Sequence, residues 1–308
     1  MRNKQVDTLY IVGNGFDIAH RYAPWNTGDA FFRTSYKDFR DFCKDNHPIL
    51  YDVLSQSLDE EWNTFEDGLG LIPFDLLYEK SGFTRFDDFV YEFEEQLKDA
   101  FESWINQVTI KKGRCWRVKR RKSAFLTFNY TTTLESCYSI AGSDILHIHG
   151  VCSNPELLHQ KPCIGHALTD GEIMAQASKV NIDYRGYYCD LLRWLQKDTM
   201  SNLNDYQNQL FFKKLQTVKK VYFYGFSFGR VDYPYIDHIV KTLPEDTVYL
   251  IGYYNGNDLA NIKKYLEHQP SIKIRVQTVK SSRYLRCDYR IMSQINKLKL
   301  RLFKTRNR

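Results

Sequence analysis

Six short apolar runs constrain the fold of this chain more than any other feature of its sequence. Each run is rich in β-branched or aromatic residues and is bounded by polar residues or glycine. The runs lie at residues 9–13, 124–129, 145–150, 219–225, 247–254 and 272–279. Nearly continuous apolar runs of this kind are typical of strands buried on both faces. Because helical patterns separate them, the sequence predicts an α/β fold, with a Rossmann-like, mainly parallel sheet flanked by helices.

The stretches between these runs differ greatly in length. The clearest helical pattern, residues 86–108, repeats apolar side chains every three or four residues, which favours core packing. Residues 30–115 and 152–215 are too long to be simple crossovers and look helical. We therefore expect a single elaborated domain over residues 1–308, with these stretches as helical insertions that form a cap or subdomain. A basic C-terminal helix is expected over about residues 284–308.

Cysteine usage and hydropathy indicate the compartment. The seven cysteines are scattered, form no C-x-x-C pair, and by their odd number fit a complete disulfide framework poorly. The chain starts with mostly polar residues, and no window approaches the roughly 18 apolar residues of a spanning helix. We expect a cytoplasmic protein, neither secreted by a standard signal nor associated with a membrane.

Positive charge is concentrated in two segments. The net charge is +6, and much of the excess lies in residues 111–122 and 296–308. Such segments bind phosphates, including those of nucleic acids. The alternative is a solvated basic loop and a basic terminal helix, since most charge runs face water.

Polar residues or glycine follow each of the first five predicted strands. The strands lead into Gly13–Asp17, Asn129, His149, residues 225–232 and Asn255. Ligands of open parallel sheets bind beyond the carboxyl ends of the strands, where these loops meet. The repetition of polar exits predicts a ligand site at that edge.

The run "ILHIHG" carries two histidines near such an exit. In a strand, alternate side chains share a face, so His147 and His149 are predicted on one face, with Leu146 and Ile148 on the other. His149, the more terminal of the two, is expected to reach the ligand crevice. For each histidine the alternative is a hydrogen-bonded core residue, and this alternative is stronger for His147.

The segment "GNGFD" follows the first strand and precedes a predicted helix. Glycines allow a sharp turn and a close approach to phosphate, and N–H groups at the start of a helix receive negative charge. The segment lacks the third glycine of G-x-G-x-x-G, and tight strand–helix turns use glycine without any ligand. No G-x-x-x-x-G-K-[ST] motif is present, which argues against a P-loop nucleotidase.

Two other chemistries have weaker support. Metal binding is suggested by the histidines and cysteines between residues 147 and 166, but their spacing matches no compact zinc finger. A nucleophile elbow is suggested by "GFSFG" at residues 225–229, but its serine is followed by His238 and His268 in no suggestive context.

An ordered set of short motifs resembles the AbiH family of bacteriophage abortive-infection proteins. The motifs are "YIVGNGFDIAH", "TSYKDF", "WNTFEDGL", "TFNYTTTLE", "HIHG", "IGHA" and "GFSFGRVDYPYID", which run from residue 10 to about 237. The same skeleton is similar, more remotely, to sirtuin-like domains of phage-defence proteins. That resemblance implies that Gly13 and Gly15 face a dinucleotide pyrophosphate and that Asn129 sits by the nicotinamide ribose. It also implies that His149 is the catalytic histidine and that Ser227 contacts the adenosine side.

The chain departs from the sirtuin pattern in three respects. Asn14 stands where sirtuins have alanine, and Thr131 stands where they have aspartate. The paired cysteines of the sirtuin zinc ribbon are absent. These departures argue against a histone-type deacetylase, and the polar Asn14 and Asp17 leave a ligand other than NAD open.

The resulting hypothesis is an antiphage effector that binds NAD and hydrolyses its nicotinamide–ribose bond, an NAD glycohydrolase. His149 would act as the base and Asn129 would orient the ribose hydroxyls or water. Asp17 and Asp232 are secondary candidates, although Asp232 is also a suitable helix cap. The predicted nucleotide-binding set is Gly13, Asn14, Gly15, Phe16, Asp17, Ser227 and Asp232, with no metal.

The rival hypothesis is a non-catalytic defence module. It would sense a nucleotide or bind nucleic acid through residues 111–122. Partners that fit either hypothesis are a small-molecule nucleotide, a phage-derived trigger, a partner defence protein and a second copy of the chain.

Overall fold

The structure is a computed structural model that describes residues 5–23, 31–81, 86–151 and 162–285. The chain divides into two compact units. Unit 1 comprises residues 1–33, 108–151 and 201–308, and unit 2 comprises residues 34–107 and 152–200. All the residues proposed above to bind a nucleotide belong to unit 1.

Unit 1 is built on a six-stranded sheet in which every pairing is parallel. The strands are β1 (Thr8–Val12), β2 (Ser123–Thr127), β3 (Ile145–His147), β4 (Lys220–Tyr224), β5 (Val248–Tyr253) and β6 (Val276–Lys280). Their order across the sheet is β3-β2-β1-β4-β5-β6. The predicted Rossmann-like parallel sheet is thus confirmed, because this is the strand order of the doubly wound fold.

Two strands differ from their predicted bounds. β3 ends at His147, so His149 lies beyond the strand rather than in it. β6 begins only at Val276, because Pro270 starts a 3-10 helical segment over Pro270–Arg275. The apolar residue Ile272 is buried from that segment rather than from a strand, which explains why an apolar pattern alone placed the strand too early.

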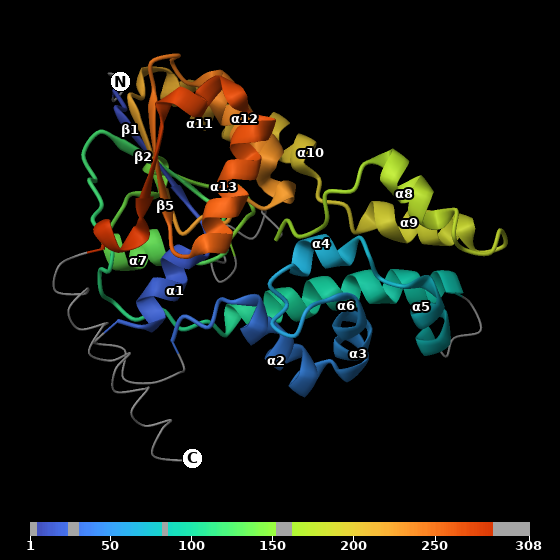
Figure 1. Ribbon diagram of the computed structural model, residues 1–308. Helices are drawn as coiled ribbons and strands as arrows, with labels where there is room; N and C mark the ends of the chain where they lie inside the picture. Colours follow the sequence, from blue (N-terminus) through green and yellow to red (C-terminus); the bar gives the residue numbers. More distant parts are fainter. Residues whose placement is uncertain (1–4, 24–30, 82–85, 152–161, 286–308) are drawn as a thin grey trace. The chain divides into compact units, whose positions relative to one another are not determined.

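Helices flank the sheet of unit 1 on both faces. They are α1 (Gly15–Arg21), α7 (Thr133–Tyr138), α11 (Tyr206–Lys213), α12 (Tyr233–Thr242) and α13 (Gly256–His268), with α10 (Thr199–Asn204) starting at the unit boundary. Alternate side chains of β1 enter different cores, with Leu9 and Ile11 in one and Tyr10 and Val12 in the other. α11, α12 and α13 pack on the first core, and α1 and α7 on the second (Figure 1).

Unit 2 is helical throughout its described elements. They are α2 (Tyr36–Asn46), α3 (Pro48–Ser57), α4 (Phe65–Leu69), α5 (Phe74–Ser81), α6 (Phe86–Asn106), α8 (Asp170–Ala177) and α9 (Arg185–Trp194). The predicted aromatic stripe packs inward where α6 is described in detail, because Phe93, Phe101 and Trp104 are buried. The predicted C-terminal helix falls almost wholly on residues 286–308, outside the described residues.

Two further findings concern the residues that the structure describes. None of their helices is both long enough and apolar enough to cross a bilayer. The described cysteines, Cys43, Cys115, Cys137, Cys163 and Cys189, are free thiols.

Candidate functional site

The loops after β1 and β4 meet where the strand order reverses. In open α/β sheets this reversal opens the crevice in which ligands bind. Here the two loops are in backbone contact: the N–H of Gly13 donates to the carbonyl oxygen of Tyr224 at 3.0 Å, and the N–H of Gly15 donates to that of Gly225 at 2.9 Å. The backbone of the GNGFD turn is therefore fixed by the β4 loop.

Glycine is required at this contact for steric reasons. A Cβ atom on Gly13 would lie 2.6 Å from the carbonyl oxygen of Gly225, and one on Gly225 would lie 2.2 Å from the amide nitrogen of Phe16. Gly225 also has a φ of +63°, which favours glycine. The amide of Phe16 donates to the carbonyl oxygen of Gly13 at 2.9 Å. Gly13 and Gly15 were expected to face a dinucleotide pyrophosphate, but their amides, like that of Phe16, have partners within the protein.

Asp17 lies at the centre of a buried polar cluster. The hydroxyl of Thr131 donates to Oδ2 of Asp17 at 2.5 Å and lies 3.0 Å from the hydroxyl of Thr133. Burial raises the pKa of Asp17 to about 6, although hydrogen bonds from Thr131, Thr133 and Asn129 oppose the shift. Oδ1 of Asp17 and Oδ1 of Asn129 are buried acceptors with no hydrogen-bond partner among the described residues.

The raised pKa of Asp17 predicts a pH-dependent effect of Asp17→Asn. The protonated carboxyl is favoured in the folded state, so its stabilisation is complete below pH 3.8 and is lost as the pH rises through about 6. Asparagine does not titrate. We expect the free energy of unfolding of Asp17→Asn, relative to the unmodified protein, to rise by about 2–3 kcal/mol between pH 4 and pH 7.

Urea unfolding of both proteins at the two pH values measures this difference. Asp246→Asn is the matched control, because Asp246 is exposed and the substitution removes the same charge. A difference for Asp17→Asn that stays constant with pH, or that Asp246→Asn reproduces, would contradict the assignment of a buried, destabilised carboxylate.

His147 joins this cluster from the end of β3. Its Nε2 lies 2.9 Å from Oε1 of Glu135, and its Nδ1 lies 3.4 Å from the carbonyl oxygen of Asn129. The second carboxylate oxygen of Glu135 is buried without a hydrogen-bond partner among the described residues. His147 therefore has the polar contacts of a core histidine, and it also borders unsatisfied acceptors.

His149 lies in a separate aromatic environment. Its Nε2 is 3.5 Å from Oδ1 of Asp232, the residue that precedes α12. The rings of Phe128 and Tyr235 pack edge-on against its imidazole, with centroids at 4.8 and 5.4 Å, and Tyr130 lies at 6.0 Å. Only 3% of His149 is exposed. The arrangement places an imidazole beside a carboxylate under an aromatic cover.

The prediction that His147 and His149 share one face of a strand is wrong. The strand stops at His147, and a turn follows in which the N–H of Gly150, at φ +81°, donates to the carbonyl oxygen of His147 at 3.1 Å. His147 contacts Glu135 of α7, whereas His149 contacts Tyr235 of α12, and these helices pack on opposite faces of the sheet. The turn has therefore directed the two imidazoles apart.

The remaining predicted residues are distributed along the same loops. Asn14 precedes α1. Phe16 is buried and stacks on Trp116, with ring centroids 5.6 Å apart. Ser227 is exposed, and its carbonyl oxygen accepts a hydrogen bond from Asn261 of α13 at 3.1 Å. The structure thus gathers Asp17 and Asn129 into one cluster and His149 and Asp232 into another, with Ser227 at the surface.

The weaker chemistries find no geometric support in the described residues. No three or more His, Cys, Asp or Glu side chains there are placed to hold a metal ion, and Cys152 and His159 lie outside this part of the chain. In the "GFSFG" loop, the positive φ angles belong to Gly225 and Phe228, not to Ser227, so the strained serine of a nucleophile elbow is missing.

Sequence reasoning missed the partners that complete both clusters. Thr133 and Glu135 come from the start of α7, and Tyr235 from α12. A signal for the first two was present, because "TTTLE" places hydroxyls and a carboxylate directly after the predicted strand exit at Asn129. Tyr235 lies within the motif "GFSFGRVDYPYID", but nothing in that motif indicated a contact with His149, which lies far from it along the chain.

These features define a doubly wound α/β protein with polar clusters beyond the carboxyl ends of its strands. The comparison with family models identifies it further: the model for bacteriophage abortive infection AbiH proteins matches residues 9–254. The chain belongs to the AbiH family, as its motifs predicted, and this family has its role in bacteriophage abortive infection. Comparisons with curated proteins and with solved structures give no match.

Proposed function

We propose that this AbiH protein binds NAD or a related nucleotide at the carboxyl edge of its sheet and hydrolyses the nicotinamide–ribose bond. In this proposal it is a cytoplasmic effector that depletes the nucleotide during infection. The family supports the abortive-infection role, and the doubly wound strand order supports a ligand at the carboxyl edge of the sheet. The choice of nucleotide and reaction rests on the clusters described above.

The observation that carries the proposal is the pair of buried acceptors, Asp17 Oδ1 and Asn129 Oδ1. A buried acceptor without a donor costs about 1–3 kcal/mol, so a ligand that supplies a donor is stabilised there. Ribose hydroxyl groups are such donors. An amide oxygen beside them can hold a hydroxyl or a water molecule in one orientation, the role assigned to Asn129.

His149 and Asp232 supply the acid–base part of the proposal. Cleavage passes through an oxocarbenium-like ribose and needs a base beside a ribose hydroxyl or the attacking water. A histidine is suited to this role near neutral pH, and a carboxylate 3.5 Å from its Nε2 favours the imidazolium that forms. Because His149 is only 3% exposed, the proposal requires Tyr130 or Tyr235 to move when the nucleotide enters.

The phosphates need a different position from the one first expected. The amides of Gly15 and Phe16 donate within the protein, so the proposal gives them no bond to the pyrophosphate. Gly13 and Gly15 then serve close backbone packing, and Asn14 and the exposed Ser227 remain the proposed polar contacts at the edge.

Variants of the two catalytic candidates test the proposal in infected cells. We expect His149→Ala and Asn129→Ala each to slow NAD loss after phage infection by about 100-fold, in the range typical of lost acid–base catalysis. His268→Ala is the matched control, because that histidine pairs with Asp237 on the surface at 2.8 Å. NAD is measured by enzymatic cycling and the amount of protein by immunoblot.

The outcomes separate the two functional hypotheses. NAD consumption that is unchanged in both variants, at equal protein levels, would reject the assignment of His149 and Asn129. Protection from phage that survives loss of His149 while NAD stays constant would favour the non-catalytic sensing module.

A further inference from the structure

A cavity of about 530 Å³ lies on the sheet face that carries Tyr10 and Tyr222, on the side of α1 and α7. It is bounded by β1, β4 and the segment 114–120. Two hydrogen bonds hold that segment in place. The N–H of Arg117 donates to the carbonyl oxygen of Tyr284 at 2.8 Å, and the hydroxyl of Tyr224 donates to the carbonyl oxygen of Arg117 at 3.0 Å. The volume is within the range of small-ligand pockets, about 300–1,000 Å³.

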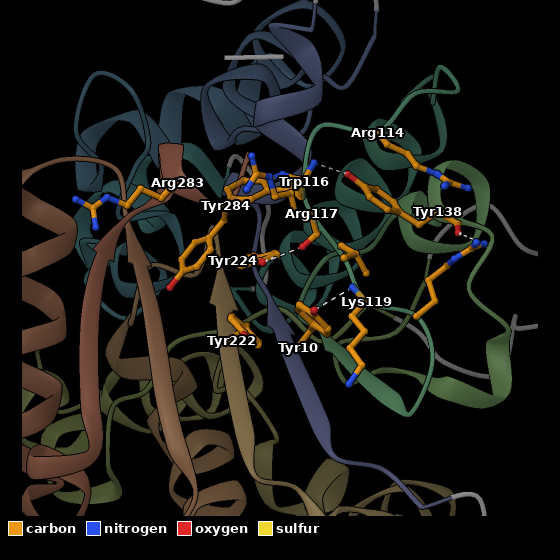
Figure 2. A pocket seen from close by; sticks show the side chains of 12 residues that line it. Tyr10, Arg114, Trp116, Arg117, Lys119, Tyr138, Tyr222, Tyr224, Arg283 and Tyr284 are labelled. Atoms are coloured by element: carbon orange, nitrogen blue, oxygen red, sulfur yellow. Dashed lines mark hydrogen bonds between the residues drawn. The ribbon is translucent and has the colours of Figure 1, made fainter. Parts of the chain in front are cut away.

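The ionisable groups of this cavity, tyrosines aside, are all cationic. Its lining includes Arg114, Arg117, Lys119, Arg120 and Arg283, and no carboxylate is among the described residues that line it. Figure 2 shows Arg283 on one side of Tyr222 and Tyr224, and Arg114 and Lys119 on the other. The side chain of Lys119 has an acidic neighbour, Asp7, 3.0 Å away, so its charge is partly compensated. Arg114 and Arg120 donate to the carbonyl oxygens of Cys137 and Tyr138, which leaves their charge in place. The cations together give the cavity a positive rim, which favours an anion.

The cavity also offers aromatic surface. Tyr222 and Tyr284 are half-buried, and their ring planes are perpendicular with centroids 6.0 Å apart. Behind Tyr222, the buried ring of Tyr10 stacks at 5.2 Å and holds it in place. Partly exposed tyrosines inside a basic rim are the pattern with which proteins stack unpaired bases while their cations track the phosphates.

The basic character continues outside the cavity. Lys112, Arg121 and Lys122 flank the lining segment and are exposed. A ligand with several phosphates can therefore contact more of these cations than a single nucleotide can. A duplex keeps its bases stacked on each other, which leaves none for Tyr222 or Tyr284. From the rings, the rim and the flanking cations, we infer that this cavity is a binding site for single-stranded nucleic acid.

Fluorescence anisotropy with labelled 12-nucleotide RNA and DNA strands tests the inference on the full chain. We expect the affinity of the unmodified protein to fall about 50-fold between 50 and 200 mM salt, as for roughly four phosphate contacts on a single strand. Arg117→Ala combined with Arg283→Ala should lower the affinity about tenfold and reduce the salt slope by about 1.4. The matched control combines Lys263→Ala and Lys264→Ala, which remove the same charge from exposed positions of α13 on the opposite sheet face.

The aromatic part is tested separately. Tyr222→Ala should lower the affinity roughly tenfold through lost stacking, whereas Tyr222→Phe, which keeps the ring, should not. Equal losses in the α13 control and the arginine pair would overturn the inference. So would competition by duplex, or by free mononucleotide, that is as strong as competition by single strand at equal nucleotide concentration. If Tyr222→Ala lowers the melting temperature, its affinity is not used. The affinity of the double arginine variant and the competition experiment then test the inference.

Discussion

Gly225→Ala is expected to lower the free energy of unfolding of unit 1 by about 4 kcal/mol. The added Cβ would lie 2.2 Å from the amide nitrogen of Phe16 and 2.3 Å from the carbonyl carbon of Gly15. Both neighbours are backbone atoms, so relief requires a shift of the β1 or β4 loop, at about 1–3 kcal/mol for overpacking. The positive φ adds about 1–2 kcal/mol for a residue with a side chain.

Chemical denaturation followed by tyrosine and tryptophan fluorescence measures this loss. Gly256→Ala is the matched control in the same unit, because a Cβ there meets no atom within 4 Å. We expect it to change the stability by less than about 1 kcal/mol. If Gly225→Ala is as stable as the control, the loops do not make the backbone contact described here.

Lys197→Met is expected to destabilise unit 2 by about 3–5 kcal/mol. The ammonium group of Lys197 lies 2.7 Å from Oε1 of Glu66, and the two side chains are 0% and 13% exposed. Removing the lysine leaves the Glu66 carboxylate buried without this cation. The loss therefore reflects a buried carboxylate that has lost this cation rather than the worth of the ion pair itself.

A double variant separates these two contributions. Glu66→Leu combined with Lys197→Met removes both charges, and we expect it to recover most of the lost stability, because apolar replacement of a buried pair is often neutral. Urea unfolding followed by far-ultraviolet circular dichroism measures the loss of helical structure, to which the helices of this unit contribute. Additive losses in the double variant would show that the two side chains do not interact.

The strands could be predicted because their signal is local. The apolar runs at 9–13, 124–129, 219–225 and 247–254 each became a strand to within two residues at either end. The run at 272–279 failed in its first half, because Pro270 starts a 3-10 turn that buries Ile272 as well as a strand would. Hydrophobic periodicity shows that a residue is buried and leaves open which backbone buries it.

The candidate site was predictable in its location and less so in its contacts. Polar strand exits placed Asp17, Asn129 and His149 at one edge of the sheet. The partners of these side chains depend on where each strand ends. The third strand ends at His147, and the turn that follows, with Gly150 at positive φ, brings His149 to the helices of the other face. A side-chain direction set by a turn cannot be read from alternation, which holds only inside a strand.

The glycines of the GNGFD turn illustrate a second difficulty. Close backbone approach requires glycine whether the neighbour is a phosphate or another loop. In this protein the neighbour in the structure is the Gly225 loop, 2.6 Å from a Cβ on Gly13. The sequence shows that position 13 is a glycine, but it does not show whether a phosphate or another loop is the neighbour that requires it.

The proposed function requires that the edge carrying Asp17, Asn129, His149 and Asp232 cleaves NAD. Incubation of the purified full chain with NAD, followed by chromatography for nicotinamide, tests it most directly. The assay is run with and without lysate of phage-infected cells, because the protein can require activation before it hydrolyses NAD. We expect nicotinamide release from the unmodified protein and from His268→Ala, and none from His149→Ala. NAD that stays intact under both conditions, or release that is equal with His149→Ala, would contradict it.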